Sequence, residues 1–502
     1  MKLKLTAFAC ALLGCFGLAA QDPVAQKYGN MITPEDLKGN LTIFASDAME
    51  GRATGTRGQK MAAAFVMSTF QDLGLSGPVN GSYYQPVELF ASKPGEIYMK
   101  VGGTQYNNYD NIAYYGSADS NGEVTLPVVF AGKGRKEDFE QVAVDGKAVL
   151  IQLASNESSR GPSTLAREKG AKLVIVYNPV AEEAKKSLAQ FQQFLSGENL
   201  SLKKRESTNA GIFFVTPDVA AKLVPSTAEK LNASIAADAK KGALKKIKAG
   251  SVTFKTSQVA RIVKSENVLG YLEGTDKKDE LVIITAHYDH IGKREHGEGD
   301  LINNGADDDC SGTVSVLQLA KVFSQAKKDG KGPRRSMLFM TVTGEEEGLL
   351  GSEYYSENPV FPLEKTVVDL NIDMVGRRDP QHKDSAPYVY VIGADKLSSE
   401  LHKLSEETNK TYTNLIFDYT YNDQNHPDRL YYRSDHWNFA KKNIPIIFYF
   451  DGIHEDYHKP SDEVEKIEFD LMAKRAQAVF YAAWEIANRD QRIVPDVKPE
   501  GK

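Results

Sequence analysis

The stretch GADDDCSG at residues 305–312 sets three aspartates side by side, between small and apolar residues. Within this stretch, no lysine or arginine neutralises the carboxylates. Carboxylate oxygens are good ligands for divalent cations such as Zn, Mn and Mg. A metal site is therefore the chemistry that this turn first suggests, provided that other ligand residues fold beside it.

Further potential ligands follow apolar runs of strand length in the C-terminal half of the chain. The runs LVIITA, SMLFMTV, TVVDLNI and IPIIFYF are each followed at once by acidic residues or histidines. A single histidine beyond a strand is usually a loop residue, but charged surface is a poor explanation for a pattern that recurs in several segments. The residues concerned are His287, Asp289 and His290 in HYDHIG, Glu345, Glu346 and Glu347 in TGEEEG, Asp373 after TVVDLNI, and His454, Asp456, Tyr457 and His458 in GIHEDYHKPSDE.

The elements that carry these residues are expected to form an α/β fold. After about residue 260, the apolar runs alternate with stretches such as SGTVSVLQLAKVFSQAKK and DLMAKRAQAVFYAAWEIANR, which predict helices. This alternation predicts a mixed, mostly parallel sheet with helices on both faces. The functional groups of such sheets gather at the carboxyl ends of the strands, so the ligand residues are expected to meet at one edge.

The types of ligand indicate which metals the site would bind. Imidazole and carboxylate, without paired cysteines, suit zinc, and carboxylate with water also suits Mn or Mg. One carboxylate can bridge two cations held about 3.5–4 Å apart. The crowded aspartates of residues 305–312 are then explained by divalent cations that act as their counter-charge. One aspartate would bridge the two cations, and the neighbouring aspartates would orient it or face solvent.

The segment HEDYH at residues 454–458 matches the H-E-x-x-H pattern of a different class of zinc proteases. That pattern binds zinc only on a helix, where residues i and i+4 share a face. Gly452, the strand before it and Pro460 leave no room for a helix of useful length. Of the two histidines, His458 alone is therefore expected to bind a metal.

The chain is expected to be exported to the periplasm or secreted. Two lysines, a short apolar core at residues 5–18 and two alanines make residues 1–20 a signal peptide. A lipoprotein with a lipid anchor on Cys15 is the alternative, because this cysteine follows LLG. No later stretch reaches the roughly 20 apolar residues of a membrane helix, so no integral membrane span is expected.

Composition argues against two other classes of protein. The formal charge of −6 is spread over the whole length without a basic arm, which excludes nucleic acid as the main partner. Cys310 is the cysteine that remains once residues 1–20 are removed. Its acidic neighbours raise the pKa of a thiol, so this residue is expected to be a small buried filler and not a nucleophile.

Six blocks of the sequence together resemble the co-catalytic zinc aminopeptidases, whose relatives include glutamate carboxypeptidases, the transferrin receptor and glutaminyl cyclases. The match is dense over residues 260–490, and the helical region 32–110 is similar to the start of the same peptidase domain. The blocks are, in order, AHYDHIG, GADDDCSG, TGEEEGLLGS, NIDMVGR, SDHWNFA and DYHKPSDE.

The resemblance implies a role for each residue of the site. Two zinc ions, for which Mn or Co could substitute, would share one carboxylate and a bridging hydroxide that attacks the peptide bond. A glutamate that does not bind metal would act as the general base. The implied residues are His287 and Asp373 for one ion, Glu346 and His458 for the other, Asp308 as the bridge, Asp289 as the residue that orients His287, Glu345 as the general base, and Tyr457 as the group that stabilises the oxyanion.

The length of 502 residues predicts two or three domains. The β-rich runs VTLPVVFAG, KAVLIQLA and AKLVIVYNP are similar in style to the protease-associated domain that is often inserted into this peptidase domain. The expected order is a signal peptide at 1–20, the first part of the peptidase domain at 21–115, the inserted domain at 116–256, the second part with the metal site at 257–492, and a tail at 493–502.

The resemblance favours an exported di-zinc metalloaminopeptidase that removes N-terminal residues from peptides. A carboxypeptidase or dipeptidase would need a cationic pocket, and Arg377, Arg429 and Arg433 lie near the motifs. A non-catalytic receptor predicts lost ligands, whereas all the implied ligands are present. A single-zinc acyltransferase similar to glutaminyl cyclase is less favoured, because the TGEEEG and GADDDCSG blocks are complete.

Overall fold

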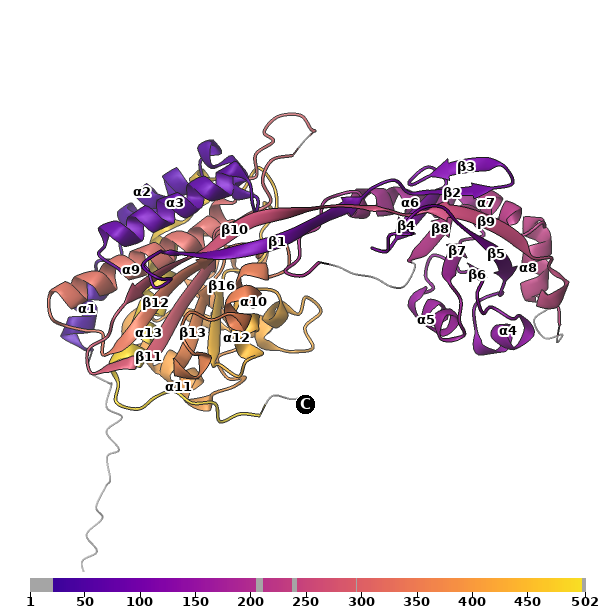
Figure 1. The fold of residues 1–502 in the computed structure, drawn as a ribbon. Helices are drawn as coiled ribbons and strands as arrows, with labels where there is room; N and C mark the ends of the chain where they lie inside the picture. The colour runs from indigo at the N-terminus through magenta and orange to yellow at the C-terminus, as the bar shows by residue number, and fades with distance from the viewer. Residues whose placement is uncertain (1–20, 205–210, 237–241, 295, 499–502) are drawn as a thin grey trace, which may run out of the picture. The chain divides into compact units, whose positions relative to one another are not determined.

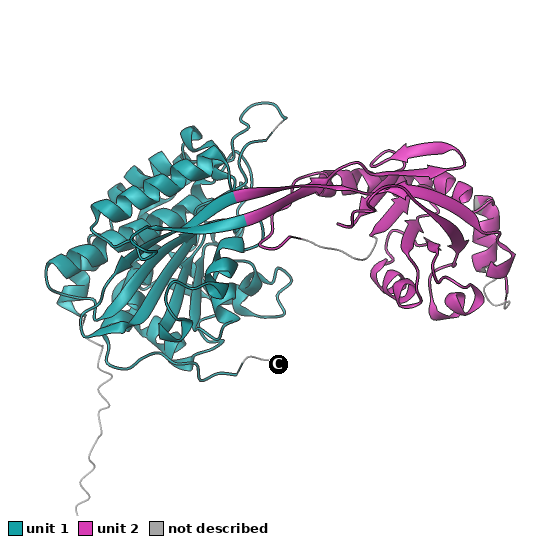
Figure 2. Ribbon diagram, viewed as in Figure 1, with its two compact units in different colours: residues 1–88, 264–502 teal, residues 89–263 magenta. Residues whose placement is uncertain are grey.

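The structure is a computed structural model that describes residues 21–498, except for residues 205–210, 237–241 and 295 (Figure 1). The predicted signal peptide and the Cys15 anchor lie outside the described residues. The chain divides into two compact units (Figure 2). The first comprises Met1–Glu88 with Lys264–Lys502, and the second comprises Leu89–Val263.

The first unit is built on a mixed sheet of eight strands. Its four central strands are parallel, and antiparallel pairs join β10 to β12 and β14 to β16, so the mixed and mostly parallel α/β sheet expected from the sequence is confirmed. The order across the sheet is β1 (Tyr84–Pro94), β10 (Gln258–Leu272), β12 (Arg335–Val342), β11 (Lys277–His287), β13 (Thr366–Ile372), β16 (Ile446–Phe450), β14 (Tyr388–Ile392) and β15 (Ile416–Asp418).

Helices cover both faces of this sheet, and two separate apolar cores lie between the layers (Figure 1). Along β11, Val282 and Ile284 belong to one core, whereas Leu281 and Ile283 belong to the other. This alternation is the two-residue period of a strand buried on both faces. One core packs against α1 (Pro23–Gly29), α2 (Pro34–Phe44), α3 (Arg57–Asp72), α9 (Gly312–Lys328), α11 (Ser399–Thr408) and α13 (Phe469–Asn488), and the other against α10 (Leu350–Glu357) and α12 (His436–Ala440).

The second unit contains its own eight-stranded sheet and two cores of its own. Its middle strands β5, β6, β7 and β8 are parallel, and helices α4 (Lys136–Gln141), α5 (Arg160–Glu168), α6 (Ala181–Leu195), α7 (Pro217–Leu223) and α8 (Ala228–Ala236) connect or follow them. The order is β3 (Thr104–Asn107), β2 (Tyr98–Val101), β9 (Gly250–Lys255), β5 (Val124–Phe130), β6 (Ala148–Gln152), β7 (Leu173–Tyr177), β8 (Ile212–Val215) and β4 (Ile112–Tyr115).

The second unit begins earlier than the inserted domain expected at 116–256. Strands β2 and β4 precede residue 116, yet β2 pairs with β9 and β4 pairs with β8. Each of the early strands is four residues long, and its partner lies about a hundred or more residues later in the chain. The change of sequence texture at 116 therefore marks the end of β4 and not the boundary between the units, which the structure places after Glu88. Among the described helices, none has the length and apolarity to cross a membrane.

Candidate metal centre

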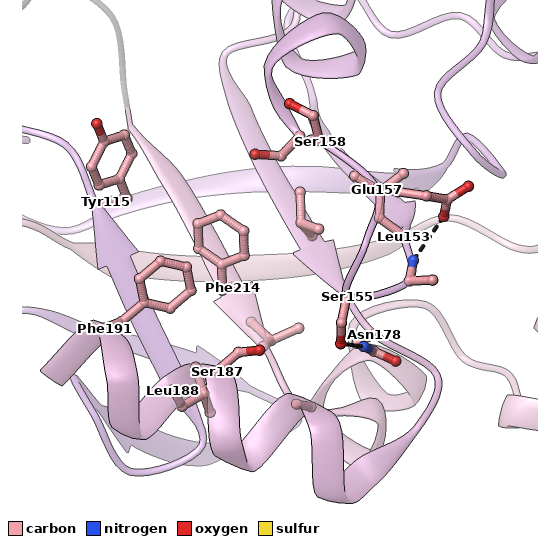
Figure 3. A pocket seen from close by; sticks show the side chains of 15 residues that line it. Tyr115, Leu153, Ser155, Glu157, Ser158, Asn178, Ser187, Leu188, Phe191 and Phe214 are labelled. Atoms are coloured by element: carbon pink, nitrogen blue, oxygen red, sulfur yellow. Dashed lines mark hydrogen bonds between the residues drawn. The ribbon is translucent and has the colours of Figure 1, made fainter. Parts of the chain in front are cut away.

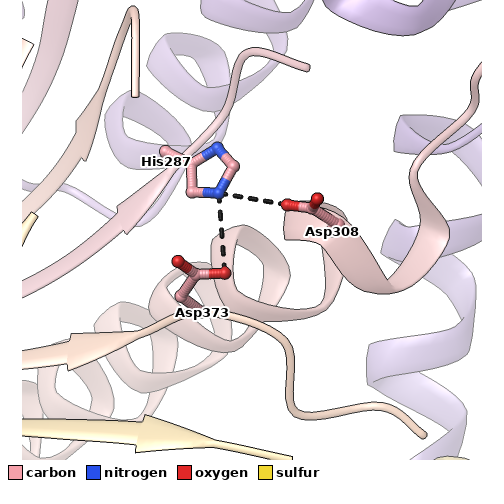
Figure 4. A group of neighbouring side chains, drawn as sticks. All are labelled: His287, Asp308 and Asp373. Atoms are coloured by element: carbon pink, nitrogen blue, oxygen red, sulfur yellow. Dashed lines mark ion pairs between the residues drawn. The ribbon is translucent and has the colours of Figure 1, made fainter. Parts of the chain in front are cut away.

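The first cluster of potential ligands lies at the carboxyl ends of two adjacent parallel strands. His287 is the last residue of β11, and Asp373 follows the last residue of β13. The Nε2 atom of His287 lies 3.2 Å from Oδ1 of Asp308 and 3.6 Å from Oδ1 of Asp373 (Figure 4). All three side chains are buried, at 1%, 3% and 8% relative exposure for His287, Asp308 and Asp373. His287 and Asp373, at the ends of the two strands, thus meet Asp308 of the turn before α9.

The second cluster shares Asp308 with the first. The Nε2 atom of His458 lies 3.1 Å from Oδ2 of Asp308 and 3.1 Å from Oε2 of Glu346. His290 also reaches this cluster, because its Nδ1 atom lies 2.7 Å from Oε1 of Glu346. The two oxygens of Asp308 therefore face different clusters, Oδ1 toward His287 and Oδ2 toward His458.

The spacing of these atoms fits zinc. In a tetrahedral zinc site with bonds of about 2.0–2.1 Å, ligand atoms lie roughly 3.3 Å apart. The separations from His287 to Asp308 and from His458 to Asp308 and Glu346 are 3.1–3.2 Å. The Nε2 atom of His458 has no well-aligned hydrogen bond among the described residues. Carboxylates and histidines at this spacing are a donor set that fits a divalent cation.

Asp307 and Asp309 explain why three aspartates adjoin. Both are fully buried, so the expectation that they face solvent is wrong. Asp307 accepts a hydrogen bond from the backbone N–H of Gly376 at 2.7 Å. Asp309 accepts one from the backbone N–H of His287 at 3.2 Å. The outer aspartates thus tie the turn to the end of β11 and to the segment after β13, which fixes the position of Asp308.

Asp289 is fully buried, but its carboxylate does not hydrogen-bond His287 directly. The Nδ1 atom of His287 lies 3.1 Å from the backbone oxygen of Asp289 and 3.9 Å from its carboxylate. The carboxylate instead accepts hydrogen bonds from the Thr54 hydroxyl at 2.7 Å and from the backbone N–H of Glu345 at 3.2 Å. Asp289 therefore holds both the His287 ring and the segment that carries Glu345.

Glu345 and Tyr457 both border the clusters. The Oε2 atom of Glu345 lies 3.9 Å from Nε2 of His287. Burial raises the pKa of Glu345 well above its usual range, and the carboxylates of Asp373 and Glu346 add to this rise. Burial and the neighbouring carboxylates likewise raise the pKa of Tyr457, whose ring stacks on His458 at 3.9 Å between centroids. The Tyr457 hydroxyl therefore stays protonated and can donate a hydrogen bond.

The surrounding carboxylates also change the pKa of His458. Burial lowers its pKa, but the carboxylates of Asp308 and Glu346, each 3.1 Å from Nε2, outweigh burial and raise the pKa to about 10. A cation that binds His458 therefore has to displace a proton at neutral pH.

The sequence predicted that the H-E-x-x-H segment does not form a helix, and the structure agrees. Residues 455–458 form a turn, and the two histidines face different partners. The Nε2 atom of His454 lies 3.2 Å from Oδ2 of Asp307, whereas His458 faces Asp308. His454 is therefore a buried partner of an orienting aspartate and not a member of either cluster.

Other residues at the site had no role in the sequence-based interpretation. The Ser434 hydroxyl donates to Oδ2 of Asp373 at 2.6 Å and accepts from the Asn371 side-chain N–H at 2.9 Å. The carboxylate of Asp462 accepts from the backbone N–H groups of Asp307 and Asp308. Ser434 and Asp462 lie in the SDHWNFA and DYHKPSDE blocks, so the signal was present, but residue type alone did not reveal their partners.

The second unit contains a separate pocket of about 370 Å³ near the carboxyl ends of β6 and β7 (Figure 3). Phe191 and Phe214, whose rings lie 4.5 Å apart, form part of its apolar lining. Ser155 accepts a hydrogen bond from Asn178 within the pocket. No histidine is among its described lining residues, so the pocket lacks the imidazole groups of the metal centre.

Known proteins are similar to this chain in sequence and in fold. Residues 267–483 match the model of a family described as Peptidase family M28. Aminopeptidase YwaD of Bacillus subtilis (strain 168) is 26% identical over 465 residues, which cover 89% of this chain and 84% of that protein. A probable leucine aminopeptidase of Trichophyton verrucosum is 30% identical over 219 residues, which cover 42% of this chain and 55% of that protein.

Solved structures agree with the fold. An aminopeptidase from Aneurinibacillus sp. strain AM-1 has a TM-score of 0.58 at 20% identity, and the alignment covers 95% of this chain and 99% of that one. A zinc aminopeptidase from Bacillus subtilis has a TM-score of 0.50 at 20% identity, covering 93% of this chain and 99% of that one. The resemblance to zinc aminopeptidases that the six sequence blocks carry is confirmed, because residues 267–483 of this chain match peptidase family M28.

Proposed function

We propose that this chain is an exported aminopeptidase that removes N-terminal residues from peptides with the help of two zinc ions. The observation that carries the proposal is the division of the Asp308 carboxylate, with Oδ1 facing His287 and Oδ2 facing His458. One ion would be held by His287, Asp373 and Asp308. The other would be held by Glu346, His458 and the same Asp308 carboxylate.

The residues around these ligands have the roles that peptide hydrolysis requires. Zinc ions bound here would lower the pKa of a water molecule and polarise the scissile carbonyl. Glu345, which lies beside the clusters, takes a proton from the attacking water and passes it to the leaving amine. The Tyr457 hydroxyl donates a hydrogen bond to the oxygen that becomes negatively charged in the tetrahedral intermediate.

The surroundings favour a substrate amine over a substrate carboxylate. The guanidinium of Arg377 lies 3.1 Å from Asp456 and 3.9 Å from Asp462, so this cation is already paired with carboxylates. Arg429 and Arg433 are exposed, and Arg429 lies over the Tyr432 ring. The buried carboxylates of the centre attract a free N-terminal amine, which supports an aminopeptidase over a carboxypeptidase.

Export rests on the sequence of residues 1–20, either as a cleaved signal peptide or with Cys15 as a lipid anchor. Fractionation of cells that express the full chain tests this part of the proposal. The mature protein is expected in the periplasm, the medium or the membrane fraction. Accumulation of uncleaved chain in the cytoplasm would contradict export and leave the peptidase activity untouched.

A peptide panel tests the activity itself. The panel contains one peptide in three forms, with a free amine, with a blocked amine and with a blocked carboxyl group. The forms with a free amine and with a blocked carboxyl group are expected to be cleaved. A chelator should abolish this cleavage, and added zinc should restore it. Release of C-terminal residues from the amine-blocked form, or cleavage that chelators do not affect, would overturn the proposal.

A further inference from the structure

The geometry points to His290 as a positioning residue that holds the Glu346 carboxylate for its cation by a hydrogen bond, without itself binding that cation. This inference rests on the two-ion site of the proposed function. His290 lies three residues beyond His287, after the end of β11, and its side chain is fully buried.

The carboxylate of Glu346 is shared between two histidines. Its Oε1 atom lies 2.7 Å from Nδ1 of His290, and its Oε2 atom lies 3.1 Å from Nε2 of His458. The two contacts use different oxygens, so His290 leaves Oε2 facing the cluster that contains Asp308 and His458. A glutamate without the contact to His290 could turn about its side-chain bonds and present either oxygen.

The distances separate a hydrogen bond from shared ligation. Two atoms bound to one tetrahedral zinc ion lie roughly 3.3 Å apart, whereas a charge-assisted N–H···O bond measures about 2.7–2.9 Å. The 2.7 Å between His290 and Glu346 falls in the second range. The 3.1 Å between His458 and Glu346 is close to the first. His290 could otherwise be counted as a ligand, because its Nδ1 atom is within 4.8 Å of ligand atoms of Asp308 and Glu346.

The ring of His290 is held in place for this contact, and its Nδ1 atom lies further from Asp308, at 3.8 Å from Oδ2. Its Nε2 atom is buried and has no hydrogen-bond partner among the described residues, so Glu346 is the polar group that fixes the ring. A Cβ atom at Gly305 would lie 2.6 Å from Cδ2 of His290, which shows how closely the backbone before the aspartates packs on the ring. The His290 and His458 rings meet edge to face at 5.6 Å.

Calorimetric titration with Zn²⁺ tests the inference. The titration compares full-length wild type, His290→Ala and His290→Asn after a chelator has removed their metal. The alanine variant is expected to bind one of its two ions about 10–100-fold more weakly than the wild type, the usual effect of losing a residue that orients a ligand. The asparagine variant is expected to recover most of that affinity, because its side-chain N–H₂ can occupy the place of the imidazole Nδ1–H. His402→Asn, a substitution on α11 outside the centre, is the matched control and should bind like the wild type.

Absorption spectra of the cobalt-substituted proteins decide between positioning and ligation. The spectrum of His290→Asn is expected to match the wild type, whereas His458→Ala should lose one ion and change the spectrum. Wild-type affinity in His290→Ala would overturn the inference, as would a spectrum of His290→Asn that shifts with the loss of a ligand. If the wild type binds two ions, either result would overturn only the role of His290 and not the proposed aminopeptidase. If the wild type binds fewer than two ions, the role of His290 and the proposed two-ion site are both contradicted.

Discussion

The Nε2 atom of His458 lies 3.1 Å from the Oδ2 atom of Asp308. The other oxygen of the same carboxylate faces His287, on the opposite side of the centre. Asp307 and Asp309 do not share this arrangement, because their carboxylates bind backbone N–H groups. Three adjacent aspartates thus perform two tasks, in which the outer two fix the turn and the middle one faces both ligand clusters.

Glu345→Gln is expected to keep both ions and to lose most of kcat. Glu345 is near the clusters but makes no ligand-spaced contact, and general-base catalysis contributes about 10²–10⁴-fold to a rate. The amide has the shape of the carboxylate but cannot accept the proton. The measurement is kcat together with metal content by mass spectrometry. Glu347→Gln, at the exposed glutamate two positions further along the chain, serves as the matched control with unchanged turnover. Near-normal kcat in Glu345→Gln would remove the general-base assignment.

His454→Ala is expected to keep the metal content of the wild type and to lower the stability of the fold. The substitution leaves the buried Asp307 carboxylate without its His454 partner. Removal of one partner from a buried ion pair costs about 3–5 kcal/mol. Metal analysis and chemical denaturation of the same variant measure the two effects. A variant that has lost an ion would instead support a ligand role for the H-E-x-x-H segment.

Cys310 is expected to be unreactive toward thiol reagents in the folded protein. Its side chain is fully buried, and burial raises the pKa of the thiol to about 12. In protein that lacks residues 1–20, Cys310 is the one cysteine of the sequence. Labelling with a chromogenic disulfide should therefore detect no fast thiol in the native state and one after denaturation. Rapid labelling of the native protein would show that the thiol is accessible.

His436 is expected to make the fold less stable as the pH falls. Burial lowers its pKa from about 6.5 to about 3, and its Nε2–H group donates to the backbone oxygen of Tyr431. Below pH 6.5 the unfolded chain binds a proton that the folded chain does not, so stability falls between about pH 6.5 and pH 3 by up to about 1.4 kcal/mol per pH unit.

His436→Gln tests this dependence, because the glutamine keeps an N–H donor but does not titrate. The Tm of the wild type is expected to fall more steeply than that of the variant between pH 7 and pH 5. All other titrating groups are common to both proteins and cancel in the comparison. Parallel Tm curves would show that His436 is not the group responsible.

The sequence predicted the central sheet and the gathering of acidic residues and histidines at its edge, for physical reasons. The strands β11, β12, β13 and β16 are buried on both faces, so each is a continuous apolar run that is visible without knowledge of its partners. Parallel strands end at one edge, so residues just beyond them could be assigned to one site.

The parts that sequence did not predict depend on contacts between distant residues. The contact of Ser434 with Asp373 spans 61 residues, and the pairing of β4 with β8 joins segments about a hundred residues apart. A serine or a four-residue strand has the same local pattern whether or not such a partner exists. The hydrogen-bond partner of His290 and the start of the second unit were hidden for the same reason.

Anomalous X-ray scattering at the zinc edge, from crystals of the zinc-loaded protein, shows directly whether two ions share Asp308. Two peaks are expected, about 3.5–4 Å apart on either side of the Asp308 carboxylate. One peak should contact His287 and Asp373, and the other should contact Glu346 and His458. A single peak, or a pair of peaks that do not share Asp308, would contradict the proposed two-ion site.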